Sequence, residues 1–396
     1  MLWLCARLAR PGLWRIALAV LPAVLLVGCS PPRAIEAARV LADLSQPDAG
    51  AQEALAPTSV AFPPGSGVAV GDLYWPPGAE AALVLVPGVV PEGKDDPRLV
   101  ELAQTLVRAR FAVLVPDIVN LRAQQVSPND ARAIAAAITW LAGCGEPHDA
   151  PSVGVIAISY AAGPAILAAL LPDAAPRVRF LVAIGGYYDL EAVVTFFTTG
   201  YFRTGPEEPW QQGEPNAYGK WVFVAANAER LDDPDDRAAL ATMAERKLND
   251  LEADVADLEA GLGPQGRAVT ALLDNRDPDR VPALIDNLPE AVRGDLAALD
   301  LSRRDLSQLE ARLLLVHGRD DPIIPSTESQ AVAAAAPEQT TLYLVDSLAH
   351  VEVDPAGLVD GFRLWRAVYA LLSERDAAPQ PELTACLAAS GAGATG

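Results

Sequence analysis

Three residue types that can cooperate in acyl transfer each follow an apolar run of the chain. They are Ser159 after 153–158, Asp320 and Asp321 after 313–316, and His350 after 341–345. A serine hydroxyl is a weak nucleophile until a neighbouring imidazole accepts its proton, and histidine, with a pKa of about 6.5, can do so near neutral pH. A carboxylate then fixes the imidazole tautomer and stabilises its charged form. These residues predict nucleophilic catalysis by a serine.

The segment around Ser159 resembles the nucleophile elbow of α/β-hydrolases. It reads Ile-Ala-Ile-Ser-Tyr-Ala-Ala-Gly over 156–163, with a buried strand before the serine and a helical pattern after it. The elbow usually reads Gly-x-Ser-x-Gly, and here Ala157 and Ala161 occupy the two glycine positions. Alanine is the next smallest residue, and Gly163 keeps one close approach of the backbone open. On this segment alone, a serine that merely begins a helix is the alternative.

The acid is indicated by the run Leu-Leu-Leu-Val-His-Gly-Arg-Asp-Asp-Pro over 313–322, which closely resembles the acid turn of the same family. In that family the acid stands three residues after the glycine, which implies Asp321. Asp320 is then a turn-forming residue. Asp189, which follows another expected strand, is an alternative acid.

The chain has only three histidines, so few residues can be the base. The family order is nucleophile, acid, histidine. His148 precedes the serine, and His317 lies on the strand before the acid turn, where a structural role is expected. The resemblance therefore implies His350 as the catalytic base. A histidine that is merely hydrogen-bonded at the surface or in the core is the alternative.

Two backbone N–H groups are expected to bind the oxyanion that forms during acyl transfer. One belongs to Tyr160, directly after the nucleophile, and the other to Val89, because Gly88 stands where the family commonly has a His-Gly turn. Tyr187 and Tyr188 follow the run 180–184 at the sheet edge where ligands bind, so they are expected to contact substrate. Further aromatic residues of the expected cap either line an apolar cleft or belong to the core of the cap: Phe196, Phe197, Tyr201, Trp210 and Trp221.

Apolar, β-rich runs alternate with helical patterns and predict the elements that position these residues. The runs lie at 68–74, 82–86, 111–116, 153–158, 180–184, 313–316 and 341–345. Runs that are apolar on both faces are typical of a parallel sheet covered by helices. Asp96-Pro97 is one of several predicted helix starts, since an Asp cap precedes a proline at the first helical position. The fold class is therefore α/β, an α/β-hydrolase fold with a mostly parallel sheet flanked by helices and a helical cap insertion.

The domain organisation follows from where this alternation begins, stops and resumes. We expect a signal peptide over 1–28, a Pro-, Ala- and Gly-rich tether over 29–66 with a short helix near 34–44, and hydrolase core over 67–189 and 310–375. The segment 190–309 is mostly helical and charged and predicts the cap, with apolar residues near heptad spacing over 235–262. A disordered tail is expected over 376–396.

The N-terminus predicts export and a lipid anchor. Three arginines precede an apolar run of about a dozen residues that is too short to span a membrane comfortably. The run ends in Leu-Val-Gly-Cys over 26–29, which resembles the lipobox of bacterial lipoproteins and implies a diacylated Cys29. Ser30 in the next position implies sorting to the outer membrane, facing the periplasm. An ordinary signal peptide or an uncleaved anchor is the alternative, and either one still exports the chain.

The net charge and the cysteines limit which partners and cofactors are expected. Removing residues 1–28, which hold three arginines and no acid, changes the net charge from −21 to −24, so nucleic acid is not an expected partner. Cys144 and Cys386 remain in an oxidising compartment, where they either form a disulfide or stay unpaired. No His/Cys cluster has metal-ligand spacing, no metal site is predicted, and the chemistry needs no cofactor. The oligomeric state is left open.

The resemblance spans about 68–372 outside the cap and is closest to the branch of dienelactone hydrolases and prolyl-oligopeptidase-like peptidases. Dienelactone hydrolases use a cysteine nucleophile where this chain has Ser159, so their specific reaction is not implied. We expect hydrolysis of a small-molecule carboxylic ester through an acyl-serine. A peptidase or acyltransferase with the same residues is one alternative, and a catalytically silent binding lipoprotein is another.

Overall fold

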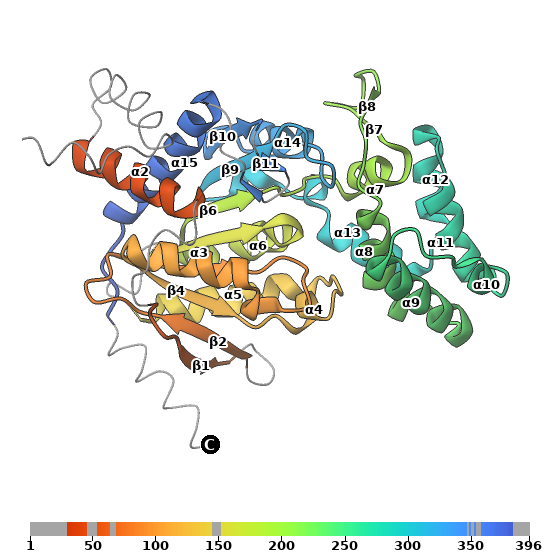
Figure 1. The fold of residues 1–396 in the computed structure, drawn as a ribbon, viewed down its shortest axis with the longest axis horizontal. Coiled ribbons are helices and arrows are strands. Elements are labelled where there is room, and N and C mark those ends of the chain that lie inside the picture. The colour runs from red at the N-terminus through yellow and green to blue at the C-terminus, as the bar shows by residue number, and fades with distance from the viewer. Residues whose placement is uncertain are drawn as a thin grey trace, which may run out of the picture.

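An eight-stranded mixed sheet forms the centre of the molecule (Figure 1). In this computed structural model, residues 30–45, 54–63, 69–144, 152–346, 348–349, 352–353 and 358–382 are described. The strand order is β1-β2-β4-β3-β5-β6-β9-β10, and their bounds are β1 Thr58–Phe62, β2 Ala69–Tyr74, β3 Ala81–Val86, β4 Phe111–Pro116, β5 Val153–Ile158, β6 Val178–Ile184, β9 Arg312–Gly318 and β10 Thr340–Val345.

The sheet is mostly parallel, as its crossover connections require. β1 pairs with β2 and β2 with β4 in antiparallel fashion, and all the other pairs are parallel. Parallel neighbours need crossover segments, and helices supply them here. The predicted α/β-hydrolase fold, a mostly parallel sheet flanked by helices, is confirmed.

Each face of the sheet has its own apolar core. On one face α5 Asn129–Ala142, α6 Ala162–Ala169 and α14 Thr327–Ala335 contribute to the first core. On the other, α2 Pro31–Ser45, α3 Pro97–Arg108 and α15 Leu358–Asp376 contribute to the second. We call these the α5/α6 face and the α3/α15 face. The predicted start of α3 is confirmed, since the Asp96 carboxylate accepts the N–H of Arg98 and Pro97 is the first helical residue.

Much of the segment predicted as a tether is packed structure. Within 29–66, α2 buries an apolar stripe of Ala34, Ala37, Val40 and Leu41, and β1 extends the sheet at its edge. The indole N–H of Trp365 on α15 donates to the carbonyl of Ala34 at 3.0 Å. The alanine-rich composition that indicated a tether instead supplies small side chains that let α2 lie close to α15. The folded core therefore includes β1, ahead of the start at residue 67 that the sequence predicted.

Salt bridges also hold α2 to the body. Arg375 on α15 is 2% exposed, its guanidinium contacts Glu36 of α2 at 2.9 Å and Glu80 at 3.1 Å, and it donates to the carbonyl of Ala109 at 2.8 Å. These hydrogen bonds from Arg375 hold the pKa of Glu36 below its usual value. Near the helix start, the N–H of Ser30 donates to the hydroxyl of Tyr369 at 2.9 Å.

The chain between β6 and β9 forms the helical region predicted as a cap, and it projects to one side of the sheet in Figure 1. Its longer elements are α7 Leu190–Thr199, α8 Tyr218–Asn227, α9 Pro234–Asn249, α10 Ala256–Glu259, α11 Pro264–Asp274, α12 Val281–Asp286 and α13 Glu290–Leu299. The apolar spacing over 235–262 does not form one helix, because α9 ends at Asn249. A two-stranded pair, β7 Tyr201–Phe202 with β8 Gln211–Gln212, interrupts the helices.

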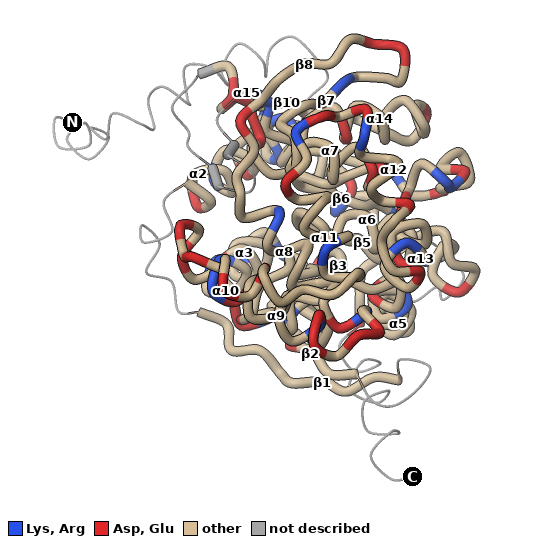
Figure 2. The backbone as a smooth tube through the Cα atoms, turned by 90° about the vertical axis from the view of Figure 1, so that its right-hand side faces the viewer, with Lys and Arg blue, Asp and Glu red and all other residues tan. Residues whose placement is uncertain are grey.

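Charge is spread over the surface seen from the cap side. Figure 2 shows acidic residues along the backbone throughout that side with basic residues between them, so neither sign of charge is confined to one stretch there. Among the helices that the structure describes, none is long and apolar enough to cross a membrane.

Candidate active site

Ser159 lies at a strained turn between β5 and the helix that follows it. Its φ is +58°, a left-handed value that non-glycine residues rarely adopt. Residues 159–161 form a short 3-10 turn that leads into α6. Such strain costs about 1–3 kcal/mol and persists where surrounding packing fixes it, as happens at functional sites. The turn has the backbone conformation expected of a nucleophile elbow.

The two alanines at the elbow fit because the tightest contacts lie elsewhere. Ala157 and Ala161 are both fully buried. A Cβ at Gly163 would lie 2.2 Å from the Cζ of Tyr187, and one at Gly186 would lie 2.6 Å from the Cβ of Ala162. The expected close approach at Gly163 is therefore present. Glycine is therefore required at Gly163 and Gly186, whereas the two usual glycine positions of the elbow accommodate alanine.

Asp321 is held as a buried hydrogen-bond acceptor at the end of β9. Its Oδ1 accepts the N–H groups of Ile323 at 2.8 Å and Ile324 at 3.0 Å, and the residue is 4% exposed. Asp320 is exposed. A buried carboxylate that is fixed by two N–H groups can orient an imidazole, whereas an exposed one is free to turn to water. Burial and backbone hydrogen bonds thus distinguish Asp321 from Asp320, and the role of Asp321 as the acid stays a prediction.

His317 has the structural environment expected from its place on the strand. Its ring is fully buried, with Nδ1 2.7 Å from the hydroxyl of Ser329 and Nε2 2.9 Å from the carbonyl of Ile324. The Nε2 atom also lies 3.4 Å from Oδ2 of Asp321. A carbonyl can only accept, so Nε2 carries the proton of this hydrogen bond. His317 thus braces the acid turn.

The predicted base, His350, lies outside the described residues. The strand before it, β10, ends at Val345, which pairs with Gly318 at the end of β9. Strands β5, β6, β9 and β10 are consecutive and parallel, so the carboxyl ends that precede Ser159, Asp321 and residue 350 are on the same edge of the sheet. His148 is likewise outside the described residues.

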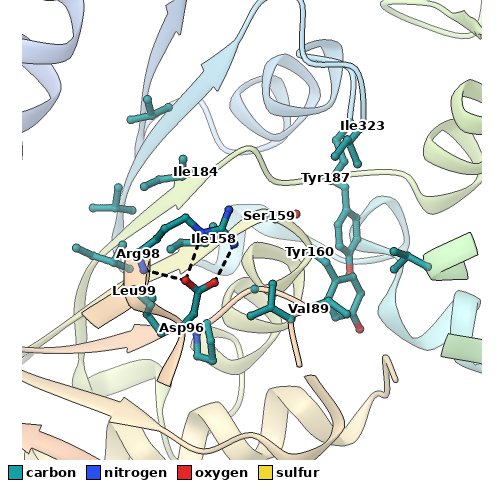
Figure 3. A pocket seen from close by; sticks show the side chains of 18 of the residues that line it. Val89, Asp96, Arg98, Leu99, Ile158, Ser159, Tyr160, Ile184, Tyr187 and Ile323 are labelled. Carbon is teal, nitrogen blue, oxygen red and sulfur yellow. Dashed lines mark hydrogen bonds and ion pairs between the residues drawn. The ribbon is translucent and has the colours of Figure 1, made fainter. Parts of the chain in front are cut away.

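A cavity of about 930 Å³ adjoins Ser159. Its volume is near the upper end of the roughly 300–1,000 Å³ that is usual for small-molecule sites. Both residues predicted to supply oxyanion donors, Val89 and Tyr160, line it beside the serine. In Figure 3, Tyr160 and Tyr187 lie on one side of Ser159, while Ile158, Ile184 and Leu99 lie on the other.

Tyr160 and Tyr187 form a stacked pair in the cavity wall. Their ring centroids are 5.8 Å apart at an interplanar angle of 22°. Tyr187 is 1% exposed and its hydroxyl donates to the carbonyl of Leu299 at 3.1 Å. The buried hydroxyl of Tyr160 has no hydrogen-bond partner within the described part of the chain, and burial raises the pKa of both phenols. The pair fixes the segment that carries the Tyr160 N–H.

Tyr188 does not line this cavity. Its N–H donates to Oε2 of Glu328 at 2.9 Å, and its carbonyl accepts the N–H groups of Leu301 and Ser302. These bonds hold its backbone against the segment after α13. Asp189, the alternative acid, caps α7 by accepting the N–H of Glu191 at 2.8 Å, and it is absent from the cavity wall as well.

Glu328 is a buried carboxyl that the sequence did not single out. It is 4% exposed, and its Oε2 accepts the N–H groups of Tyr188 at 2.9 Å and Asp189 at 2.7 Å. Burial raises its pKa to about 8, more than the two N–H donors lower it. A Glu in the first turn of a helix is ordinary in sequence. Only the tertiary structure reveals that it anchors the loop after β6.

Of the five cap aromatics proposed for the cleft, one lines the cavity. Phe197 does so, together with cap residues such as Leu190, Val194 and Phe223. Trp210 is instead held by Arg203, whose guanidinium lies 4.2 Å from its ring centroid, and its indole N–H donates to Asp279. The presence of an aromatic residue in the cap sequence could not distinguish a cavity wall, as at Phe197, from a contact with other cap side chains, as at Trp210.

Cys144, one of the two cysteines considered for a disulfide, is disulfide-bonded. Its expected partner, Cys386, lies outside the described residues, as does Cys29. The carbonyl of Cys144 also accepts the N–H of Glu382 at 2.9 Å. The chain just after α15 therefore lies beside Cys144.

Comparison with known proteins yields similar structures but no related family. No protein-family model and no curated protein matches the chain. A dienelactone hydrolase from Anabaena variabilis is 14% identical, with 80% of this chain and 96% of that chain covered and a TM-score of 0.40. A serine hydrolase from Cycloclasticus zankles is 13% identical, with 81% and 96% covered and a TM-score of 0.41. The rice cell wall degrading esterase of Xanthomonas oryzae is 16% identical, with 84% and 92% covered and a TM-score of 0.47. At such identities the similarity concerns the fold alone.

Proposed function

We propose that this chain is an exported, lipid-anchored serine hydrolase that cleaves carboxylic esters through an acyl-serine intermediate. The observation that carries the proposal is Ser159, held at a positive φ before α6 and lining a cavity beside Val89 and Tyr160. A serine in that conformation presents its hydroxyl above the end of the sheet, with the N–H of the next residue beside it.

The reaction has two similar halves. The Oγ of Ser159 bonds to the ester carbonyl carbon while its proton passes to His350, and the N–H groups of Tyr160 and Val89 stabilise the oxyanion. The bond to the alcohol oxygen then breaks, and the alcohol leaves with the proton from His350. Water attacks the acyl-serine in the same way, which releases the carboxylic acid and restores Ser159. Asp321, fixed by two backbone N–H groups, orients His350 and stabilises its charged form.

Hydrolysis of p-nitrophenyl esters tests this function directly. The chain from Ser30 onward, which keeps every described residue, is compared with Ser159→Ala and His350→Ala, and each is treated with a fluorophosphonate probe. We expect the parent to turn over esters and to be labelled. Ser159→Ala should lose turnover by about a million-fold and take no label, because loss of a catalytic serine removes the nucleophile.

The remaining outcomes assign the alternatives. A parent that is neither active nor labelled would contradict the hydrolase and favour a silent binding lipoprotein. Labelling without ester turnover would favour a peptidase or an acyltransferase, and aminoacyl amides and competing alcohol acceptors would separate these two.

The anchor has its own test. We propose that Cys29 is acylated and that it holds the protein on the outer membrane, facing the periplasm. Two or three acyl chains hold much more firmly than one. The full chain should fractionate with membranes and carry an N-terminal mass increase of two or three acyl chains, and Cys29→Ala should lose both. A soluble parent that begins at another residue would contradict the anchor.

A further inference from the structure

The cavity beside Ser159 continues away from the cap, between the sheet and the helices of its α3/α15 face. We call this part the buried limb. Its walls are apolar side chains from β5, β6, β9, α2, α3 and α15: Val40, Leu41, Leu44, Leu99, Leu102, Leu106, Ile156, Val182, Leu314, Leu364, Ala367, Val368 and Leu371. In Figure 3, Ile158, Ile184 and Leu99 mark where the limb leaves Ser159.

The accessibility of strand residues on this face shows where the limb runs. Along β6, Phe180 is 0% exposed, Val182 is 7% exposed and Ile184 is half-buried. Leu181 and Ala183, which point to the other face of the same strand, are 0% and 2% exposed. The opening therefore widens toward the strand ends and the serine, and only on the α3/α15 face.

Phe180 fills the space over the sheet beyond the deep end of the limb. A Cβ at Gly154 on the neighbouring strand would lie only 2.1 Å from the Cζ of Phe180, so the end of the ring occupies the space that a side chain at residue 154 would need. Phe180 is fully buried and is not part of the cavity wall. The limb thus starts at Ser159 and is stopped by packed core.

The polar side chains of the limb are not arranged to receive a polar ligand. Arg98 and Asp96 pair with each other, with Nη2 and Oδ2 2.8 Å apart. The Thr105 hydroxyl accepts a hydrogen bond from Arg108 at 2.8 Å. Apart from the half-buried Glu101 of α3, the other side chains of the limb wall are hydrocarbon, so a ligand that fills the limb must be mostly hydrocarbon along its length.

We propose that the buried limb binds the acyl chain of a long-chain ester whose carbonyl lies at Ser159, with α2 as part of its outer wall. This proposal rests on the proposed hydrolase function and specifies its substrate class. Continuity with the serine selects a substrate chain over the lipid of Cys29. Ser30, the residue after Cys29, is ten residues before Val40, about 15 Å along α2, and it is held at Tyr369.

Direct binding tests the limb without catalysis. Titration of hexadecanoic acid into the Ser159→Ala chain from Ser30 onward should show saturable binding, while acetic acid should show none. Ala367→Phe, which adds a ring to the limb wall, should weaken hexadecanoic acid binding at least tenfold. Ala370→Phe makes the same change on the same helix at a partly buried residue that packs against the second core but lies outside the cavity wall, and it should leave binding within about twofold.

A second pair of variants covers the case in which Ala367→Phe does not fold. Val40→Phe narrows the limb from α2, and Ile35→Phe adds the same ring at a residue that is 55% exposed. The proposal expects weaker binding for Val40→Phe alone. Equal binding by Val40→Phe and Ile35→Phe would overturn it.

Chain-length dependence of turnover separates the limb from the hydrolase function. With p-nitrophenyl esters kept below their aggregation concentration, kcat/KM should rise by about fourfold per added methylene until the limb is full, since each buried methylene contributes about 0.8 kcal/mol. Ala367→Phe should lower the ratio of dodecanoate to acetate kcat/KM at least tenfold relative to Ala370→Phe.

The outcomes distinguish the two proposals. A parent that hydrolyses acetate and takes the fluorophosphonate label, but shows a flat chain-length profile, keeps the hydrolase and overturns the limb. Hexadecanoic acid binding that Ala367→Phe weakens, in a parent with neither turnover nor label, overturns the hydrolase and shows a lipid-binding cavity. A third outcome is that the lipid on Cys29 itself fills the limb. The full lipidated protein would then not bind hexadecanoic acid, while the chain that begins at Ser30 would bind it. That result overturns the assignment of the limb to a substrate chain.

Discussion

The two faces of the central sheet are packed in different ways. On the α5/α6 face, Val155, Leu181 and Leu313 are fully buried, and none of them lines the cavity beside Ser159. On the α3/α15 face, the alternate residues of the same strands, such as Val182 and Val316, stay partly accessible at 7% each. The first face fixes the elbow at Ser159, and the second leaves space beside it. One sheet therefore supplies both the rigidity that a nucleophile needs and the room that a substrate needs.

The attachment of α2 to the α3/α15 face gives the largest expected effect. Arg375→Ala should lower the free energy of unfolding by about 3 kcal/mol, because it removes a buried guanidinium from Glu36, Glu80 and the carbonyl of Ala109 and leaves the two carboxylates to Arg110 alone. Arg33→Ala removes a more exposed pair with Asp376 and should lower it by at most about 1 kcal/mol. Urea unfolding monitored by circular dichroism measures both. Equal losses would show that apolar packing alone holds α2.

The tight α5/α6 face is probed at its narrowest contact. Gly163→Ala places a methyl 2.2 Å from the buried ring of Tyr187, so we expect a loss of about 1–3 kcal/mol of stability and slower ester turnover. Gly294→Ala is the matched control, since nothing lies within 4 Å of its added Cβ in the interior of α13. There the better helix propensity should stabilise the protein by up to about 1 kcal/mol. A neutral Gly163→Ala would mean that Tyr187 moves freely and that this face is not rigid.

The buried carboxyl of Glu328 predicts a pH dependence. Its pKa is raised from 4.5 to about 8 in the folded chain, so the native state keeps a proton that the unfolded state releases between these values. Stability should therefore fall as pH rises through this window, by up to about 1.4 kcal/mol per pH unit from this group. Glu328→Gln, which retains an acceptor for the N–H groups of Tyr188 and Asp189, should lose that slope.

Unfolding free energies measured from pH 5 to pH 8 check this prediction. Glu338→Gln changes an exposed residue at the end of the following turn and should keep the parent's slope. If Glu328→Gln and Glu338→Gln show the same pH dependence, the site around Glu328 is hydrated and its carboxyl is charged at neutral pH.

The smallest effects compare the two faces within one strand. Val182→Ile adds a methylene toward the buried limb and should change stability by less than about 1 kcal/mol. Ala183→Val, one residue on, adds bulk to the closed α5/α6 face and should lower it by about 1–3 kcal/mol. Thermal unfolding of the pair measures the difference. Similar losses at both positions would contradict the presence of space beside Val182.

The local features of the site could be predicted from sequence, while the cavity could not. Ser159 and Asp321 stand in contiguous motifs, so strand, turn and helix signals indicated their conformations. The buried limb depends on the distance between α15 and a sheet strand that is far from it in sequence, and no local pattern encodes that distance. The same reason hid Glu328, whose partners Tyr188 and Asp189 are about 140 residues away.

The N-terminal segment shows how composition can mislead. A stretch rich in alanine and proline indicated a tether, yet Ala34 and Ala37 are small because α15 lies against them. The pairing of β1 with β2 and the Glu36 carboxylate on Arg375 are long-range contacts. Sequence reasoning found the short helix near 34–44 but could not tell a solvated helix from a docked one.

The bond from the Ser30 N–H to the Tyr369 hydroxyl bears on how the proposed enzyme would meet its substrate. With Cys29 acylated, only one peptide unit would separate the lipid from the folded body. Without a flexible linker, such a protein could not extend far from the membrane. Its active site would stay at a fixed distance above the bilayer. It would act on what diffuses to that height, and lateral movement of the whole molecule in the membrane would be its means of search.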